Sequence, residues 1–299
     1  MKITKLLFVT KFEELGFDAL QSLLNLRNAD LNHVIFINVI ERERVAMHRG
    51  KGYQKDEEIR LRETANIRFI DWAENLFEQG MEVGVYIVVG SVVQEVNKAA
   101  KKEEADLIVI GRPHKGVLEQ LYAGSDVTEL LRRASIPVLV YKHLSETAIA
   151  FDEPFARPLV ATDWSPASLK AIEYLKVLKD VIQEIDIVHV ANEKDLKGSS
   201  AMQIQKTRKE TRGKLQSLCE IFEAEGIKAK EHVYVGDPVV EIERAARDCK
   251  SSMIVLGSSA KTYWVERWLG SIPQTIAEKS IFPTLLIPPE MENSPKGEN

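Results

Sequence analysis

Two stretches of sequence decide the fold: Leu107-Ile108-Val109-Ile110-Gly111 and Met253-Ile254-Val255-Leu256-Gly257. Each is a short apolar run that ends on a glycine, and the two glycines lie 146 residues apart. The same spacing separates three further pairs: Gly90 and Gly236, Gly124-Ser125 and Gly270-Ser271, and Pro137 and Pro283. Placing residues 90–142 over 236–288 without a gap gives 13 identities in 53 positions. Because unrelated glycines would not keep one spacing, the chain contains two copies of one unit.

Short apolar runs alternate with helical stretches in both copies. The expected strands are 5–10, 32–39, 81–88, 107–110 and 138–141, then 159–162, 185–190, 229–235, 253–256 and 284–287. The expected helices are 13–27, 57–79, 92–102 and 126–134, then 166–181, 203–225, 239–249 and 273–279. Apolar runs of this kind are typical of strands buried on both faces of a parallel sheet. The alternation predicts right-handed βαβ crossovers and an α/β fold of two tandem doubly wound domains.

The repeat also predicts the domain boundaries. The N-terminal strands match at a slightly larger spacing, with 6–10 over 158–162, which indicates intervening loops of different length. We expect domains at 1–142 and 157–289, joined by a linker at 143–156. Residues 290–299 have the polar composition of a disordered tail.

Composition excludes several classes of protein. Of the 299 residues, 44% are hydrophobic and 28% charged, which is typical of a globular protein and not of a disordered or collagen-like chain. The net charge of −5 argues against a nucleic-acid partner. No run approaches the roughly 18 apolar residues that span a bilayer, and the apolar N-terminal stretch is too short for a signal sequence. We therefore expect a cytoplasmic protein without a membrane partner.

The cysteines point the same way. Cys219 and Cys249 are 30 residues apart, without a second pair of metal ligands nearby in the sequence. This spacing favours a reducing compartment and does not predict a zinc site.

Two loops of the second copy follow strand ends and carry polar residues. Asp163 comes directly after the first strand, where a carboxylate can accept hydrogen bonds from a ribose hydroxyl or a base, or orient Mg²⁺. Gly257-Ser258-Ser259-Ala260 follows the fourth strand, and Gly270-Ser271 then precedes a helix. Glycines let backbone N–H groups approach a phosphate, and a helix N-terminus adds partial positive charge. Ligands of open α/β sheets bind at this edge.

Both copies resemble the universal stress protein family. Its signature, Gly-x2-Gly-x9-Gly-(Ser/Thr) after the fourth strand with an aspartate after the first, is similar to 257–271 and Asp163 in the second copy. The resemblance covers nearly the whole chain, twice. It implies a five-stranded parallel sheet of order 3-2-1-4-5 in each copy, with ATP or another adenine nucleotide over the strand ends. It also implies pairing of the two domains with each other, with a homodimer as a further possibility.

The resemblance assigns binding roles residue by residue. Ala161, Thr162 and Asp163 would face the adenosine, and Val190 would line the adenine pocket. The phosphates would be held by 257–260, with Gly257, Ser259 and Ala260, and by Gly270, Ser271 and Ile272.

The sequence departs from the signature, mostly in the first copy. Ala260 and His114 stand in place of the second signature glycine. Lys11 replaces the aspartate after strand one, and Asp126 follows Gly124-Ser125. Lysine cannot accept a hydrogen bond, and a carboxylate repels phosphate. We therefore predict that the second domain holds the main nucleotide site and that the first domain holds a degenerate one.

The sequence favours a nucleotide-binding stress or signalling protein over an enzyme. It shows no Ser-His-Asp order, no paired metal carboxylates and no nucleophile beside a base, so at most slow ATP hydrolysis is expected. His189 lies inside an expected strand and is interpreted as a packed residue. An adenylate-forming enzyme or ATP-pyrophosphatase of the same broad fold would carry a Ser-Gly-Gly-x-Asp-Ser-like loop after the first strand. Thr162-Asp163-Trp164-Ser165-Pro166 stands there without the glycines, which disfavours this alternative. A tandem scaffold without nucleotide is the other alternative.

Overall fold

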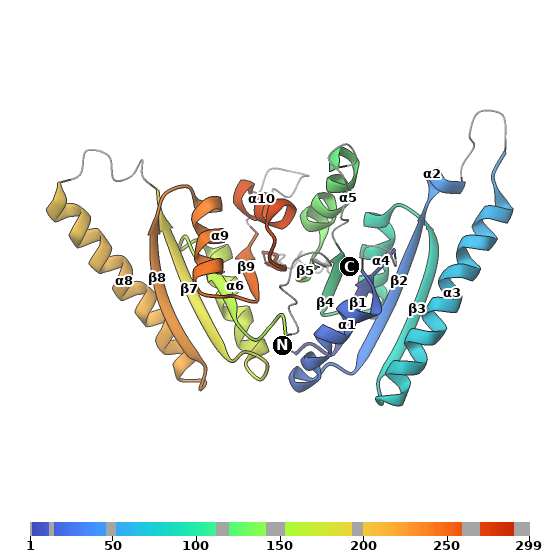
Figure 1. Ribbon diagram of the computed structural model, residues 1–299, viewed down its shortest axis with the longest axis horizontal. Coiled ribbons are helices and arrows are strands. Elements are labelled where there is room, and N and C mark those ends of the chain that lie inside the picture. Colours follow the sequence, from blue (N-terminus) through green and yellow to red (C-terminus); the bar gives the residue numbers. More distant parts are fainter. Residues whose placement is uncertain are drawn as a thin grey trace, which may run out of the picture. The chain divides into compact units, whose positions relative to one another are not determined.

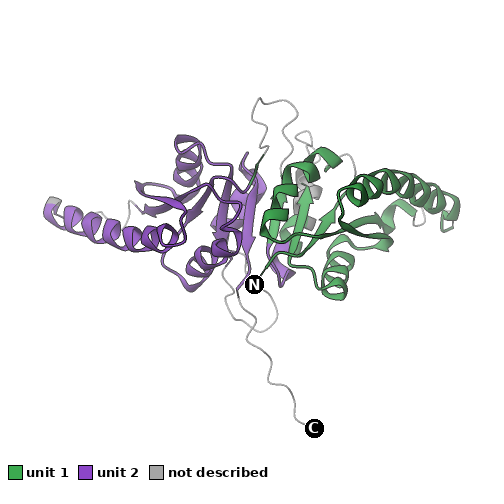
Figure 2. Cartoon of the chain, turned by 90° about the horizontal axis from the view of Figure 1, so that it is seen from below, with its two compact units in different colours: residues 1–130, 138–154 green, residues 131–137, 155–299 purple. Residues whose placement is uncertain are grey.

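The chain divides into two compact units in a computed structural model that describes residues 2–11, 15–45, 52–111, 120–141, 153–192, 200–258 and 270–289. Unit 1 comprises residues 1–130 and 138–154, and unit 2 comprises 131–137 and 155–299 (Figure 2). Of the predicted linker, only 153–156 are described, and the predicted tail lies outside the described residues. No helix in the described ranges has the length and apolar character needed to cross a bilayer.

The first copy is a parallel sheet in the strand order β3-β2-β1-β4-β5. Its strands are β1 (Lys5–Val9), β2 (His33–Glu41), β3 (Glu82–Gly90), β4 (Leu107–Gly111) and β5 (Val138–Tyr141). Its helices are α1 (Phe17–Leu23), α2 (Arg42–Val45), α3 (Lys55–Glu78), α4 (Val92–Glu103) and α5 (Gln120–Arg133), with a 3-10 turn at Leu24–Ala29.

The second copy has the same parallel order, β8-β7-β6-β9-β10. Its strands are β6 (Pro158–Ala161), β7 (Glu184–Ala191), β8 (Lys228–Val235), β9 (Met253–Gly257) and β10 (Thr284–Ile287). Its helices are α6 (Pro166–Leu175), α8 (Ala201–Glu223), α9 (Pro238–Asp248) and α10 (Ser271–Lys279), with a 3-10 turn at Lys176–Leu178. The expected α/β class and the 3-2-1-4-5 order are confirmed in both copies.

Helices cover both faces of each sheet. In unit 1, α3 and α4 lie on opposite faces of β2 and β3, and in unit 2, α8 and α9 do the same for β7 and β8 (Figure 1). The inner strands β1, β4, β6 and β9 are almost entirely buried, as their apolar runs predict. The expectation of two buried faces is wrong for β3 and β8, whose residues are mostly half-buried or exposed. Each lies at the end of its own unit's strand order and pairs there with one neighbouring strand, so less of it is covered than of an inner strand.

Helix limits differ from the prediction chiefly near the N-terminal ends. The helix expected at 13–27 begins at Phe17 and passes into the 3-10 turn, and the helix expected at 166–181 ends in a 3-10 turn at Leu178. The helix expected to begin at Asp126 begins instead at Gln120. That difference bears directly on the predicted site of unit 1.

Candidate functional site

The edge formed by the carboxyl ends of β6 and β9 is held together by a close backbone approach. A Cβ placed on Gly257, the last residue of β9, would lie 2.0 Å from the carbonyl oxygen of Ala167 and 2.8 Å from the amide nitrogen of Ser168. Both atoms belong to the first turn of α6. Glycine is therefore required at this position for packing, and the approach brings the loop after strand one beside the end of strand four. Packing against α6 is therefore an alternative explanation for a glycine at position 257, beside its expected role in phosphate binding.

Asp163 lies in the loop between β6 and α6. Its side chain is exposed, and its Oδ1 accepts a hydrogen bond from the backbone N–H of Ser165 at 3.0 Å. Ser165 is the N-cap of α6, and its Oγ accepts the N–H of Ser168 at 3.3 Å, with Pro166 in the first turn. Desolvation by the loop raises the pKa of Asp163, but hydrogen bonds from Ser165 and Ser168 outweigh it and lower the pKa below its ordinary value. The loop therefore presents an ionised carboxylate at the sheet edge.

Trp164 adopts a backbone conformation that bulky residues avoid. Its φ is 65°, in the left-handed region, and its N–H donates to Thr162 Oγ1 at 3.1 Å. Its ring lies against the ring of His189, with centroids 5.4 Å apart, and Lys214 Nζ lies 5.6 Å from the Trp164 centroid. Strained residues of this kind are concentrated at ligand sites, so the conformation supports a functional role for this loop.

His189 fixes the loop from the neighbouring strand. Its Nδ1 lies 2.8 Å from the carbonyl oxygen of Thr162, and the residue is half-buried in β7. The interpretation of His189 as a packed residue agrees with this position, and the structure adds a hydrogen bond to the loop backbone. Val190 follows it and is also half-buried, as is Ala161 at the end of β6.

The helix N-terminus expected after Gly270 is present. Gly270 is the N-cap of α10 with φ 83°, a conformation that favours glycine, and within the described residues no side chain caps the helix. Ser271 is exposed and Ile272 half-buried in the first turn. Pro273 has no N–H, so the first-turn donors available to an anion are those of Ser271 and Ile272. The predicted ligands Ser259 and Ala260 lie outside the described residues.

Unit 1 repeats the frame of this edge with different chemistry. Asn38 on β2 donates a hydrogen bond to the carbonyl oxygen of Thr10 at 2.9 Å, as His189 contacts Thr162 in unit 2. Lys11, at the position of Asp163, forms an ion pair with Glu41 at 2.6 Å. The edge therefore carries an internally neutralised ion pair where unit 2 carries a carboxylate that is hydrogen-bonded to its own loop.

The second signature pair of unit 1 does not form a helix N-terminus. Gly124 and Ser125 lie inside α5, whose first residue is Gln120, so the backbone N–H groups there belong to the helix interior. Gly270 prevents an equivalent extension of α10 because its φ of 83° is not helical. The prediction of a helix start at Asp126 is wrong for this reason. His114 and the side chain of Asp126 lie outside the part of the chain that the structure describes.

Comparison with known proteins agrees with the duplicated fold. The sequence pattern of the universal stress protein family matches residues 2–142 and again residues 155–288. The chain belongs to the universal stress protein family. Two curated members match about half of it: universal stress protein MJ0577 of Methanocaldococcus jannaschii is 26% identical over 153 residues, 44% of this chain and 94% of that protein. Universal stress protein YxiE of Bacillus subtilis is 28% identical over 146 residues, 44% of this chain and 99% of that protein.

A solved structure matches the tandem arrangement. A universal stress protein from Archaeoglobus fulgidus superimposes with a TM-score of 0.74 at 21% identity and covers 97% of both chains. At this identity the likeness supports the fold alone. The family member described here therefore shares a two-copy fold with a solved protein, and its site chemistry must be argued from its own residues.

Sequence reasoning missed the residues that pack against the loop of Asp163. Lys214 Nζ and the His189 ring both lie against the Trp164 ring, and His189 Nδ1 contacts the carbonyl oxygen of Thr162. Lys214 is 50 residues from Trp164 in the sequence, on α8, so no local pattern could pair them. A bulky residue between Asp163 and the helix cap Ser165 was the available signal.

Proposed function

We propose that unit 2 binds an adenine nucleotide, ATP or a related molecule, at the carboxyl edge of β6, β7 and β9, and that the protein acts in a stress response or in signalling through this binding. The observation that carries the proposal is the approach of Gly257 to the first turn of α6, which places the Asp163 loop beside the strand that leads into the glycine signature. Membership of the universal stress protein family supports it.

The proposed contacts divide between the two ends of the nucleotide. The Asp163 carboxylate accepts hydrogen bonds from the ribose hydroxyls, and Val190 lines the base pocket. The N–H groups of Ser271 and Ile272, the Ser271 hydroxyl and the positive end of α10 face the phosphates. Mg²⁺ would accompany the nucleotide as a phosphate counter-ion, and Asp163 is the described carboxylate available to orient it.

Unit 1 is not expected to contribute an equivalent site. Lys11 offers no acceptor to a ribose, and its ion pair with Glu41 occupies that edge. The N–H groups of Gly124 and Ser125 are used within α5. One nucleotide per chain is therefore the proposed stoichiometry.

Calorimetric titration of the full chain with ATP and Mg²⁺ tests this proposal, with Asp163→Ala and Lys11→Ala compared. Loss of a hydrogen bond to a charged group costs about 1.5–3 kcal/mol, so Asp163→Ala should weaken binding roughly 10–100-fold. Lys11→Ala should leave the affinity unchanged. Equal affinity of Asp163→Ala and the unaltered chain would refute the assignment.

Mass analysis of small molecules that copurify with the chain separates the proposal from its rivals. An adenine nucleotide that is lost in Asp163→Ala supports the site in unit 2. Absence of copurifying nucleotide together with absence of heat on titration would favour a tandem scaffold. Release of phosphate at more than a slow rate would favour an enzyme.

A further inference from the structure

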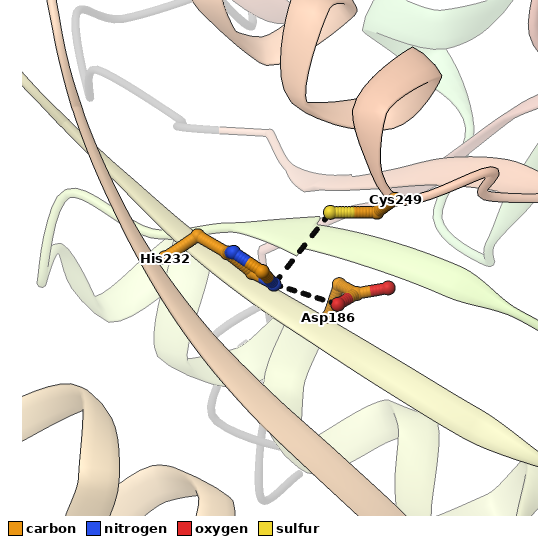
Figure 3. A group of neighbouring side chains, drawn as sticks. All are labelled: Asp186, His232 and Cys249. Atoms are coloured by element: carbon orange, nitrogen blue, oxygen red, sulfur yellow. Dashed lines mark hydrogen bonds and ion pairs between the residues drawn. The ribbon is translucent and has the colours of Figure 1, made fainter.

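Three metal-ligating side chains meet in unit 2 at a distance from the nucleotide edge. They are Asp186 on β7, His232 on β8 and Cys249, which directly follows α9 (Figure 3). Asp186 is the third residue of its strand, and α9 runs back from the end of β8, so Cys249 lies toward the amino ends of the strands. The candidate nucleotide site is at their carboxyl ends.

The register of the sheet brings the first two ligands together. Asp186 pairs with Lys230, and Val188 pairs with His232, so Asp186 and His232 are diagonal neighbours on the same face. That face is covered by α9, which packs on both strands and delivers Cys249. Three elements that are separate in sequence thus converge on one point.

The ligand atoms are close enough to share one ion. His232 Nε2 lies 2.7 Å from Asp186 Oδ1 and 3.5 Å from Cys249 Sγ, and one atom from each residue lies within 4.8 Å of the others. Tetrahedral zinc with nitrogen, oxygen and sulfur ligands at about 2.0–2.3 Å sets its ligand atoms roughly 3.3–3.7 Å apart. The sulfur–nitrogen pair already has this spacing, and the carboxylate oxygen lies closer to Nε2 than the ion requires, so it must move away from the imidazole.

The Asp186 carboxylate is a buried acceptor with unused capacity. The Asp186 side chain is 3% exposed, and its Oδ2 is buried without a hydrogen-bond partner among the described residues. Such an oxygen is costly unless something binds it. His232 is 28% exposed and Cys249 is partly exposed, so an ion and a water have a path to the cluster. The guanidinium of Arg157, which donates to the Cys249 carbonyl oxygen, is paired with Glu184 at 3.3 Å.

We infer that Asp186, His232 and Cys249 bind a divalent transition-metal ion of the zinc class, with a water as the fourth ligand. Binding places thiolate, neutral imidazole and carboxylate on the ion and releases the protons of the thiol and the imidazole. No local sequence pattern predicts this site, because its ligands are 46 and 17 residues apart and only one is a cysteine.

A nucleophilic Cys-His-Asp triad does not fit the same residues. In a triad the imidazole contacts the nucleophile through one nitrogen and the acid through the other. Here Nε2 faces both Cys249 Sγ and Asp186 Oδ1. A metal-free ion pair is the remaining rival: hydrogen bonds to Asp186 and Cys249 raise the pKa of His232 to about 10.

Unit 1 contains no such ligand set at the matching positions. Ile35 stands for Asp186, Tyr86 for His232 and Glu103 for Cys249, and the Tyr86 hydroxyl donates to Glu103. The cluster is therefore a feature of unit 2 and not of the shared scaffold. A single metal ion per chain is expected.

Titration of the full chain with Co²⁺, without nucleotide, tests the inference. A thiolate on Co²⁺ gives a strong charge-transfer absorption in the near ultraviolet, and zinc should displace it at one equivalent. Cys249→Ser should remove the absorption, and Cys219→Ser, which alters the other cysteine, should keep it. Asp186→Asn should weaken zinc binding by more than the roughly 10–100-fold that loss of an outer partner costs.

Circular dichroism of each variant shows whether it remains folded, and Asp186→Asn preserves the shape of the side chain. The metal site is refuted if the folded chain shows no charge-transfer band, or if the band survives Cys249→Ser. Loss of the band in Cys219→Ser alone would place the thiolate ligand elsewhere. None of these outcomes depends on nucleotide binding, so the proposed function stands or falls separately.

Discussion

Units 1 and 2 share a backbone plan but differ in chemistry at both edges of the sheet. At the carboxyl edge, unit 1 has the Lys11–Glu41 ion pair where unit 2 has the Asp163 carboxylate, which accepts a hydrogen bond from the Ser165 N–H. At the opposite edge, unit 1 has Tyr86 and Glu103 where unit 2 has His232 and Cys249. The comparison teaches that the two copies retain the strand order and differ in the groups that we propose to contact ligands.

Some exchanges preserve a structural role. Asn38 and His189 are different residues at equivalent positions, and each contacts the carbonyl oxygen of the threonine that ends strand one. In other places the residue type is also retained: Gly80 in unit 1 and Gly226 in unit 2 each follow the long helix of their unit, and each has a positive φ. These structural roles are therefore retained together with the backbone geometry. The residue after the first strand, in contrast, differs in charge: it is Lys11 in unit 1 and Asp163 in unit 2.

The largest expected effect comes from filling the space at Gly257. Gly257→Ala places a Cβ 2.0 Å from the carbonyl oxygen of Ala167, so α6 must move away from β9. We expect the free energy of unfolding to fall by on the order of 3 kcal/mol, measured by chemical denaturation. Gly213→Ala is the matched control, because its Cβ would meet nothing within 4 Å on α8. That variant should gain about 0.5–1 kcal/mol.

A loss below about 0.5 kcal/mol in Gly257→Ala would show that α6 can shift freely. The close approach of Gly257 to α6 would then not be what positions the Asp163 loop beside β9.

Charge exchange between the units should have the next largest effect. Asp163→Lys should weaken ATP binding at least as much as Asp163→Ala, roughly 10–100-fold, because it removes the acceptor and adds a cation that repels Mg²⁺. Lys11→Asp should not create a second site, because Gly124 and Ser125 remain inside α5. Calorimetric titration measures the affinity of the first variant and the number of sites in the second. A second site of similar affinity in Lys11→Asp would show that the side chain at position 11 alone accounts for the difference in nucleotide binding between the units.

The N-caps of α9 and α4 offer a smaller comparison. Asp237 accepts the N–H groups of Val239 and Val240 at 3.0 and 3.2 Å, whereas its counterpart Ser91 makes no capping bond. Asp237→Ala should cost about 1 kcal/mol of unfolding free energy. Ser91→Ala should change it by only about a few tenths. Equal losses would mean that Ser91 caps α4 in solution.

The smallest expected effect is the acid titration of Asp163. Desolvation opposes ionisation, but the hydrogen bonds of Ser165 and Ser168 prevail, so the pKa of the folded state lies below 3.8. A depressed carboxyl pKa stabilises the fold above the unfolded pKa, and this contribution is lost as pH falls through the folded value. Carbon NMR of the carboxyl should show a midpoint below 3.8, and Ser165→Ala should raise it. An unchanged midpoint in Ser165→Ala would remove that hydroxyl as the cause.

Most of the fold could be predicted from local sequence. The strands β5 and β10 have the predicted limits, and the others differ by one or two residues, because buried parallel strands are continuous apolar runs between glycine and proline. The cap at Ser165-Pro166 is likewise local. The start of α5 could not be predicted, because the same Gly-Ser pair is helical in unit 1 and precedes a helix in unit 2.

The sequence by itself determined that one α/β unit occurs twice, and that Asp163 and Lys11 stand at matching positions. A constant spacing of glycines and an apolar period are properties of the chain alone. Only the tertiary structure decided that Gly257 touches α6, that Trp164 packs between His189 and Lys214, and that Asp186, His232 and Cys249 meet. Each of these contacts joins separate elements, and their distances depend on register and helix packing, which no local stretch encodes.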